Sequence, residues 1–210
     1  MKRVRILLAD DHNMLIEAMK NLLEPEFEVI DTASDGRSLV SKAIKLNPDV
    51  IVMDISMPLL NGLEAGRQLK TALPKVKFIY LTMNQDQDII AEALKIGAMG
   101  FLVKHSAYSE LRNAIRQSLL GRTYITPLVG KHTVTSYFQA PLRGENPIHL
   151  TPRQREVLQL LAEGRSMKEV AFALDVTTRT VAFHKYRMME DLNLKSNAEL
   201  IQYAVRRHIV

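Results

Sequence analysis

Five polar residues with side chains suited to phosphoryl transfer each stand at the end of a short apolar run. They are Asp10, Asp11, Asp54, Thr82 and Lys104. Three carboxylates held close together repel one another, and a divalent cation offsets that repulsion. Because all-oxygen ligands favour magnesium over zinc, the acids predict a Mg²⁺ site. An aspartate beside such an ion can carry an acyl phosphate, so the set predicts a phosphorylated carboxylate.

The acids differ in the roles that their positions favour. Asp54 follows the buried-type run "VIVM" and is the expected nucleophile. Asp11 and the backbone carbonyl of Ser56 are expected to complete the protein ligands of the ion, with Asp10 acting directly or through water. A charge at the end of a buried strand is therefore explained as a metal-anchored phosphoryl acceptor.

Lys104 and Thr82 are expected to bind the transferred phosphoryl group. The Lys104 ammonium would neutralise one phosphoryl oxygen, and the Thr82 hydroxyl would donate a hydrogen bond to another. Both residues follow apolar runs, "FIYL" before Thr82 and "GFLV" before Lys104. If these polar residues had no function and only faced solvent, acids, a hydroxyl and a lysine would not be expected to occur only at the ends of the apolar runs.

The apolar runs themselves predict the elements that bring these groups together. Strand-like runs occur five times, at residues 4–9, 29–33, 50–53, 78–81 and 101–103, and segments with helical spacing lie between them. Strands that alternate with helices form a parallel sheet covered on both faces. Such sheets bind ligands beyond the carboxyl ends of their strands, so the polar set is predicted to share one crevice.

Residues 1 to about 120 resemble the receiver domain of two-component response regulators. The matching motifs are "ADD", "MDISMPLLNG", "LT" and "GAMGFLVK", in the family's order and spacing. The resemblance implies a flavodoxin-like α/β fold, a doubly wound five-stranded parallel sheet, and a sensor histidine kinase as phosphoryl donor. It also implies that Phe101 turns inward as Thr82 moves toward the phosphate. Phe101 lacks the hydroxyl of the commoner tyrosine, so its part in switching must depend on packing.

The chain is predicted to hold two domains joined by a linker. Residues 1–121 form the receiver domain, which ends in the amphipathic segment "LRNAIRQSLLGR". Residues 122–147 are rich in proline and glycine and are predicted to be the linker, although "LVGKHTVTSYF" within them could form a short helix. Residues 148–210 have helical periodicity and few strand signals.

The second domain is predicted to be a small all-α helix-turn-helix domain. Thr151 is a good helix cap, and short helices at about 166–174 and 178–192 flank a tight turn at 175–177. This part resembles the LuxR-type domain of NarL/FixJ-class regulators in "LTPRQREVLQLLAEG", "KEVAFAL" and "LNLKS". The resemblance implies that the helix at 178–192 enters the major groove of double-stranded DNA.

Helical spacing sorts the side chains of this recognition helix. Val181, Met188 and Leu192 form the expected inward stripe. The residues expected to contact phosphates, base edges, sugars or thymine methyl groups are Arg179, Phe183, Lys185, Tyr186 and Arg187. Ala182 stands where the family usually has a DNA-contacting lysine, so a low or unusual base specificity is expected.

The amino-acid composition argues against a membrane-spanning or secreted protein. Hydrophobic residues make up 47% of the chain and charged residues 24%, and no apolar run approaches the length of a membrane span. Two aspartates follow the first apolar run, so a signal peptide is not expected. The absence of cysteine fits the reducing environment of the cytoplasm.

Most of the net charge of +5 comes from residues 123–210, which contain 12 Lys/Arg against 8 Asp/Glu. This excess of positive charge favours a polyanionic partner.

The sequence therefore predicts a DNA-binding response regulator that a histidine kinase phosphorylates at Asp54 in the presence of Mg²⁺. It is not expected to be an enzyme with its own substrate, although it would hydrolyse its acyl phosphate slowly. A single small domain binds DNA weakly, so a homodimer on two half-sites is expected. Two alternatives stay open, a phosphorylation-responsive protein-interaction switch and a regulator that works without phosphorylation.

Overall fold

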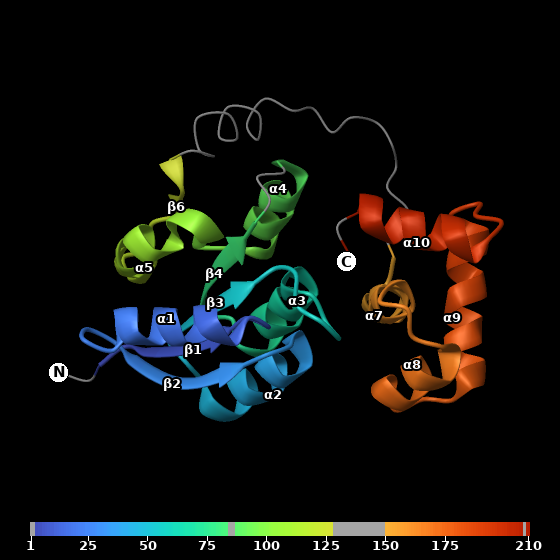
Figure 1. Ribbon diagram of the computed structural model, residues 1–210, viewed down its shortest axis with the longest axis horizontal. Helices are drawn as coiled ribbons and strands as arrows, with labels where there is room; N and C mark the ends of the chain where they lie inside the picture. The colour runs from blue at the N-terminus through green and yellow to red at the C-terminus, as the bar shows by residue number, and fades with distance from the viewer. Residues whose placement is uncertain (1–2, 84–86, 128–149, 208) are drawn as a thin grey trace. The chain divides into compact units, whose positions relative to one another are not determined.

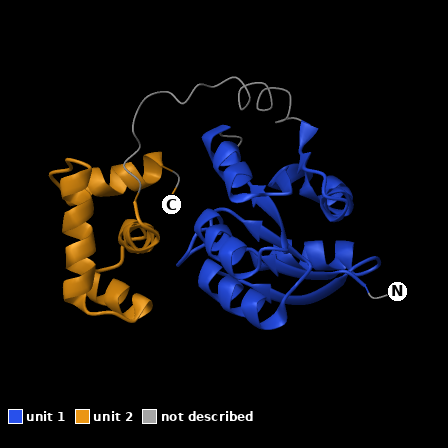
Figure 2. Ribbon diagram, turned by 180° about the vertical axis from the view of Figure 1, so that it is seen from behind, with its two compact units in different colours: residues 1–141 blue, residues 142–210 orange. Residues whose placement is uncertain are grey.

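The computed structural model describes residues 3–83, 87–127, 150–207 and 209–210. The chain divides into two compact units, residues 1–141 and 142–210 (Figure 2). Most of the predicted linker at 122–147, including the segment "LVGKHTVTSYF", lies outside the described residues. No helix in the described ranges combines the length and apolar character that a bilayer crossing needs.

The first unit is a parallel sheet with helices on both faces (Figure 1). The strand order is β2-β1-β3-β4-β5-β6, and every pair of neighbours is parallel. The strands are β1 (Arg5–Ala9), β2 (Glu28–Ala33), β3 (Val50–Asp54), β4 (Lys77–Thr82), β5 (Gly100–Val103) and β6 (Tyr124–Ile125). The helices are α1 (Asn13–Leu23), α2 (Gly36–Leu46), α3 (Gly62–Ala72), α4 (Gln87–Ile96) and α5 (Lys104–Leu119). The predicted doubly wound fold is confirmed.

Alternating strand residues build a separate core on each face of the sheet. Ile51 and Met53 pack with residues of α2, α3 and α4, whereas Val50 and Val52 pack with residues of α1 and α5. The side chains of β3 are buried on both faces, which explains the continuous apolar run in the sequence. Burial of this central strand fixes the position of Asp54 at its end.

The sheet has a sixth strand that the sequence analysis did not predict. β6 contains only Tyr124 and Ile125, and it pairs with Gly100 and Phe101 of β5. The Thr126 N–H donates to the Phe101 carbonyl at 3.0 Å, which extends the pairing by one bond. Five strands were expected because two residues cannot show the alternation that identifies a strand. The new strand falls inside the predicted linker.

The second unit has four helices in its described residues. They are α7 (Pro152–Ala162), α8 (Met167–Leu174), α9 (Thr178–Asp191) and α10 (Asn197–Arg206). Thr151 begins α7 with a capping box, in which its side chain accepts from the Gln154 N–H and the Gln154 side chain accepts from the Thr151 N–H. Asp175 ends α8 in the left-handed region, with φ 52°, and turns the chain into α9. The expected helix-turn-helix is therefore present.

Candidate functional site

The carboxyl ends of three strands and the first residue of α5 supply the predicted polar set. Asp10 follows β1, Asp54 is the last residue of β3, and Thr82 is the last residue of β4. Lys104 follows β5 directly and begins α5. Since β1, β3, β4 and β5 are neighbours in a parallel sheet, all of these ends lie at one edge.

Lys104 binds two of the acids at once. Its Nζ lies 2.8 Å from Asp10 Oδ2 and 3.0 Å from Asp54 Oδ2. Asp10 is completely buried, and Asp54 is 2% exposed. Buried carboxylates need such a partner because losing hydration costs several kcal/mol per ion. The lysine therefore holds the two acids side by side at the edge of the sheet.

The surroundings of Asp54 act on its proton affinity in opposite directions. Burial raises the pKa of this carboxyl above its usual value, and the charge of Asp10 raises it further. The Lys104 ammonium and the Ser56 N–H stabilise the charged form and oppose this rise in the pKa. The pKa of Lys104 is lowered by burial but raised more strongly by Asp10 and Asp54. A further cation beside Asp54 would favour its charged, nucleophilic form.

His12 is a member of the acidic cluster that the sequence analysis did not single out. Its Nδ1 lies 2.9 Å from Asp10 Oδ1 and 2.8 Å from Asp11 Oδ1. The hydrogen bond to Asp10 and the charge of Asp11 raise the pKa of this imidazole. The sequence feature that could have identified His12 is its position directly after Asp10 and Asp11.

The acidic residues fit a hard cation. Asp10, Asp11 and His12 each offer a ligand atom, and these atoms lie within 4.8 Å of one another. Asp54 joins the same edge through its shared contact with Lys104. The carboxylates of Asp10, Asp11 and Asp54 are the oxygen donors that Mg²⁺ prefers, whereas the single imidazole is a softer ligand.

The loop after β3 approaches the site closely at a glycine. A Cβ on Gly62 would lie 2.2 Å from the Asp54 carbonyl oxygen, so no other residue fits there without a backbone shift. The Gly62 N–H donates to the Ile55 carbonyl at 2.8 Å and closes the loop. Ser56, whose carbonyl is the predicted metal ligand, is exposed within this loop.

Phe101, the predicted switch residue, is completely buried. It lies opposite Tyr80 of β4 and Ile125 of β6, and it belongs to the core on the α2, α3 and α4 face. Thr82, the other predicted switch residue, is 3% exposed and pairs with Val103 of β5. Both residues are therefore in the packed interior beside the strand ends.

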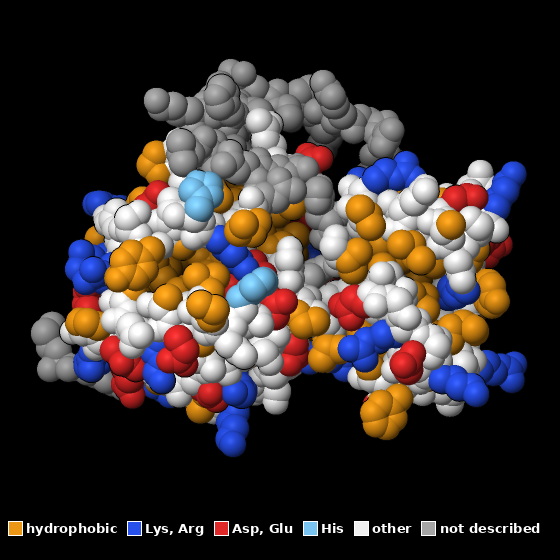
Figure 3. Space-filling view, viewed as in Figure 1, with side chains coloured by type: hydrophobic (Ala, Val, Ile, Leu, Met, Phe, Trp, Pro, Cys, Tyr) orange, Lys and Arg blue, Asp and Glu red, His pale blue; other side chains and the backbone are white. Residues whose placement is uncertain are grey.

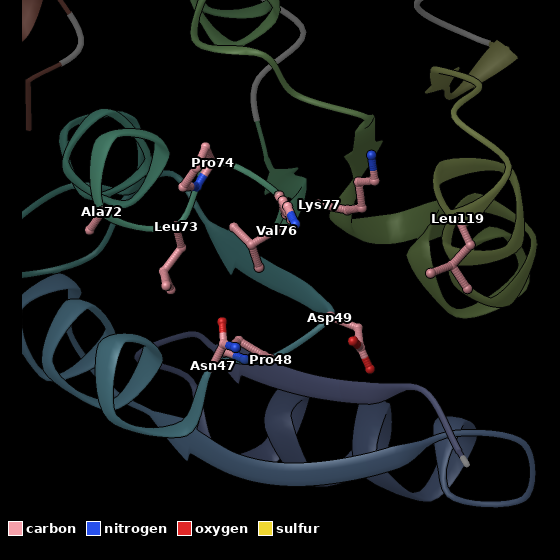
Figure 4. Close-up of a pocket in the computed structure, with 10 residues that line it drawn as sticks. Asn47, Pro48, Asp49, Ala72, Leu73, Pro74, Val76, Lys77 and Leu119 are labelled. Carbon is pink, nitrogen blue, oxygen red and sulfur yellow. The ribbon is translucent and has the colours of Figure 1, made fainter.

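A surface pocket of about 500 Å³ lies at the other end of the sheet (Figure 4). The loops before β3 and β4 line it, with Pro48, Leu73 and Pro74 among its residues and Leu119 of α5 at its side. The amino ends of the strands form this pocket, whereas the polar set lies at their carboxyl ends. The pocket therefore has no part in the chemistry at Asp54.

The second unit presents four of the five predicted DNA-contacting side chains. Arg179 and Arg187 are exposed, and Phe183 and Tyr186 are 65% and 59% exposed. Lys185, the fifth predicted contact, is only 8% exposed, so the structure does not present it on the helix surface. It comes four residues after Val181 and three before Met188, and helical geometry puts all three on the inward face.

Comparison with known families matches both units. Residues 6–116 match the family described as response regulator receiver domain. Residues 149–204 match the family described as bacterial regulatory proteins, luxR family. The first match contains every residue of the polar set, and the second contains the whole of α7, α8 and α9.

Curated relatives align with almost the whole chain. The oxygen regulatory protein NreC of Staphylococcus carnosus is 34% identical over 215 residues, covering 99% of both proteins. The transcriptional regulatory protein LiaR of Bacillus subtilis is 35% identical over 212 residues, with the same coverage. The chain is therefore similar to two-domain regulators throughout its length.

Solved structures give the same result for the fold. RcsB from Salmonella enterica serovar Typhimurium, bound to a promoter in the presence of the phosphomimetic BeF3⁻, aligns with a TM-score of 0.61. It is 25% identical, and the alignment covers 96% of this chain and 98% of that one. A further structure of the RcsB response regulator, from Salmonella typhimurium, aligns with a TM-score of 0.65 at 24% identity.

Proposed function

The chain belongs to the NarL/FixJ-class response regulators, which join a receiver domain to a LuxR-type DNA-binding domain, and we propose that phosphorylation of Asp54 controls its activity on DNA. A sensor histidine kinase would be the phosphoryl donor. The observation that carries the proposal is the contact of Lys104 with both Asp10 and Asp54. It joins a nucleophile, a metal-binding acid and a phosphate-binding cation in one site.

The proposed chemistry assigns one task to each residue. A carboxylate oxygen of Asp54 attacks the phosphorus of a phosphohistidine, a P–O bond forms, and the P–N bond breaks as the imidazole leaves. Asp10, Asp11, Asp54 and the Ser56 carbonyl would hold Mg²⁺, which would supply charge neutralisation for the phosphoryl oxygens. Lys104 and the Thr82 hydroxyl bind the phosphoryl oxygens after transfer. Slow attack of water on the acyl phosphate would return Asp54 to its carboxylate.

The proposed coupling to the second domain is a population shift. Added charge at Asp54 favours the arrangement in which Thr82 has moved toward the phosphate and Phe101 is turned inward. Phe101 is completely buried in this structure, which fits the inward position. The shift would favour a homodimer, and two paired domains would bind two half-sites of duplex DNA. We place the protein in the cytoplasm, where its kinase and DNA would both reach it.

The DNA contacts proposed for the second domain are Arg179, Phe183, Tyr186 and Arg187. The test is the affinity of the full chain for duplex DNA over a range of salt concentrations, with and without an acyl-phosphate donor and Mg²⁺. Neutralising phosphates makes log K fall linearly with log salt, so a DNA-binding protein gives a clear slope. We expect the affinity to rise on phosphorylation in the wild type and to stay constant in Asp54→Asn.

Each alternative predicts a different result. A protein-interaction switch would show no salt-dependent affinity for duplex DNA. A regulator that works without phosphorylation would bind with the same slope and affinity before and after treatment with the donor. In a DNA-binding protein, Arg179→Ala should reduce the salt slope by about 1, since one phosphate contact is lost.

A further inference from the structure

The exposed face of α9 carries little positive charge for a helix that contacts a polyanion. Of its three cationic side chains, Lys185 is 8% exposed and packs on the inward face. Its Nζ lies 5.3 Å from the centre of the Tyr186 ring, so the charge rests against an aromatic face. Arg179, near the start of the helix, is exposed.

The third cation, Arg187, is held by two acids of the same helix. Its Nη1 lies 3.2 Å from Glu190 Oε2, and its Nε lies 3.2 Å from Asp191 Oδ1. These exposed pairs are weak, so the arginine could turn toward a phosphate. The two carboxylates would still repel that phosphate, and the three side chains together carry a net negative charge. The two acids therefore weaken any contact that Arg187 makes with guanine or phosphate.

Two large aromatic side chains stand on the exposed face of α9. Phe183 and Tyr186 are three residues apart, so they share one face of α9, and both are more than half exposed. Ala182, next to them, is small and partly exposed. Figure 3 shows hydrophobic side chains standing on the surface of the second unit. Exposed rings of this size favour a partner that removes them from water.

We propose that α9 recognises DNA chiefly through apolar contact of Phe183 and Tyr186 with the 5-methyl groups of thymine. The inference rests on the proposed binding of duplex DNA and names the chemical group that is read. The thymine methyl is the apolar group on the base edges of the major groove, where the other features are hydrogen-bond donors and acceptors. A face with two aromatic rings, one alanine, the exposed Arg179 and the acid-paired Arg187 can bury that methyl but offers few donors for guanine.

The test replaces thymine by deoxyuridine, which removes the methyl and keeps every hydrogen-bonding group. A duplex is first selected from a randomised pool with the full wild-type chain, treated with an acyl-phosphate donor and Mg²⁺. Its affinity is then compared with that of the same duplex carrying deoxyuridine in place of each thymine in turn. We expect a loss of about four-fold at each contacted position, the effect of one buried methyl group. The salt slope should not change, because no phosphate contact is lost.

Matched variants assign the effect to α9. Phe183→Ala should bind the thymine and deoxyuridine duplexes with equal affinity at the position that Phe183 contacts. Phe172→Ala is the control, because Phe172 is 91% exposed but belongs to α8, and it should keep the four-fold ratio. The substituted side chains are on the surface, so the variants should fold.

The outcomes of this test distinguish failure of the proposed thymine contact from failure of the proposed DNA binding. Salt-dependent binding with equal affinity for thymine and deoxyuridine at every position would overturn the methyl contact and leave DNA binding intact. An unchanged thymine preference in both Phe183→Ala and Tyr186→Ala would also overturn it. If no duplex in the pool binds, both the inference and the proposed function fail, and the aromatic face would belong to a protein partner.

Discussion

Lys104 Nζ lies 3.0 Å from Asp54 Oδ2, so the group that would bind a transferred phosphoryl oxygen already contacts the acceptor. The same Nζ lies 2.8 Å from Asp10 Oδ2. Phosphorylation would exchange these carboxylate contacts for contacts with phosphoryl oxygens. Lys104 is therefore expected both to stabilise the unphosphorylated fold and to take part in the chemistry.

Replacing Lys104 by methionine should show that Lys104 stabilises the unphosphorylated fold. The variant keeps the length of the side chain but leaves two buried carboxylates without their cation. Removing one partner of a buried ion pair costs about 3 kcal/mol, so the free energy of unfolding in the presence of a chelator should fall by that order. Urea unfolding at neutral pH measures it. Lys104→Arg keeps the charge, so its free energy of unfolding should fall much less. Equal stability of wild type and Lys104→Met would contradict the stabilising role of Lys104.

Tyr80 carries a buried hydroxyl without a hydrogen-bond partner among the described residues. Burial raises the pKa of this phenol well above its usual value. Tyr80→Phe removes the unsatisfied group, so the free energy of unfolding should rise by about 1 kcal/mol. Tyr124→Phe is the matched control, because the Tyr124 hydroxyl donates to Glu110 Oε2 at 3.1 Å. The free energy of unfolding of Tyr124→Phe should fall by about 1 kcal/mol. A similar fall in Tyr80→Phe would show that the Tyr80 hydroxyl has a hydrogen-bond partner.

Gly66 and Tyr80 should be coupled in a double-mutant cycle. A Cβ on Gly66 would lie 1.8 Å from Tyr80 Oη and 3.1 Å from Cζ. Gly66→Ala should therefore lower the free energy of unfolding by about 2 kcal/mol through overpacking. In the Tyr80→Phe background the nearest ring atom is the one at 3.1 Å, so the loss should be much smaller. Additive losses in the double variant would mean that the two sites do not interact.

The ion pair between Glu26 and Arg116 should make stability depend on pH. Arg116 donates to both carboxylate oxygens, at 2.7 Å and 2.6 Å, and this contact lowers the pKa of Glu26 below its usual 4.5. A lowered pKa in the folded state adds stability above pH 4.5, and that stability is lost as the pH falls through the folded pKa. Arg116→Gln should thus lower the Tm at pH 7 and have little effect near pH 3. A pH-independent Tm difference would count against the pair. Arg112→Gln, which removes a charge that lowers the pKa of Glu26 without a hydrogen bond, should give a smaller pH-dependent difference.

The polar set could be predicted because each member follows a buried strand, and parallel strands bring their carboxyl ends to one edge. β6 could not be predicted, since two residues show no periodicity and its pairing depends on β5. Lys185 was named as a DNA contact for its charge, although its spacing from Val181 and Met188 puts it on the inward face. The contact of His12 with Asp10 and Asp11 depends on the turn into α1, which residue types alone do not fix.

The most direct measurement is the mass of the intact protein after treatment with an acyl-phosphate donor and Mg²⁺, in wild type and Asp54→Asn. Wild type should gain the mass of one phosphoryl group, and Asp54→Asn should gain none. Chelation of Mg²⁺ should also prevent the gain in wild type. An equal gain in both proteins would contradict Asp54 as the acceptor and the site built around it.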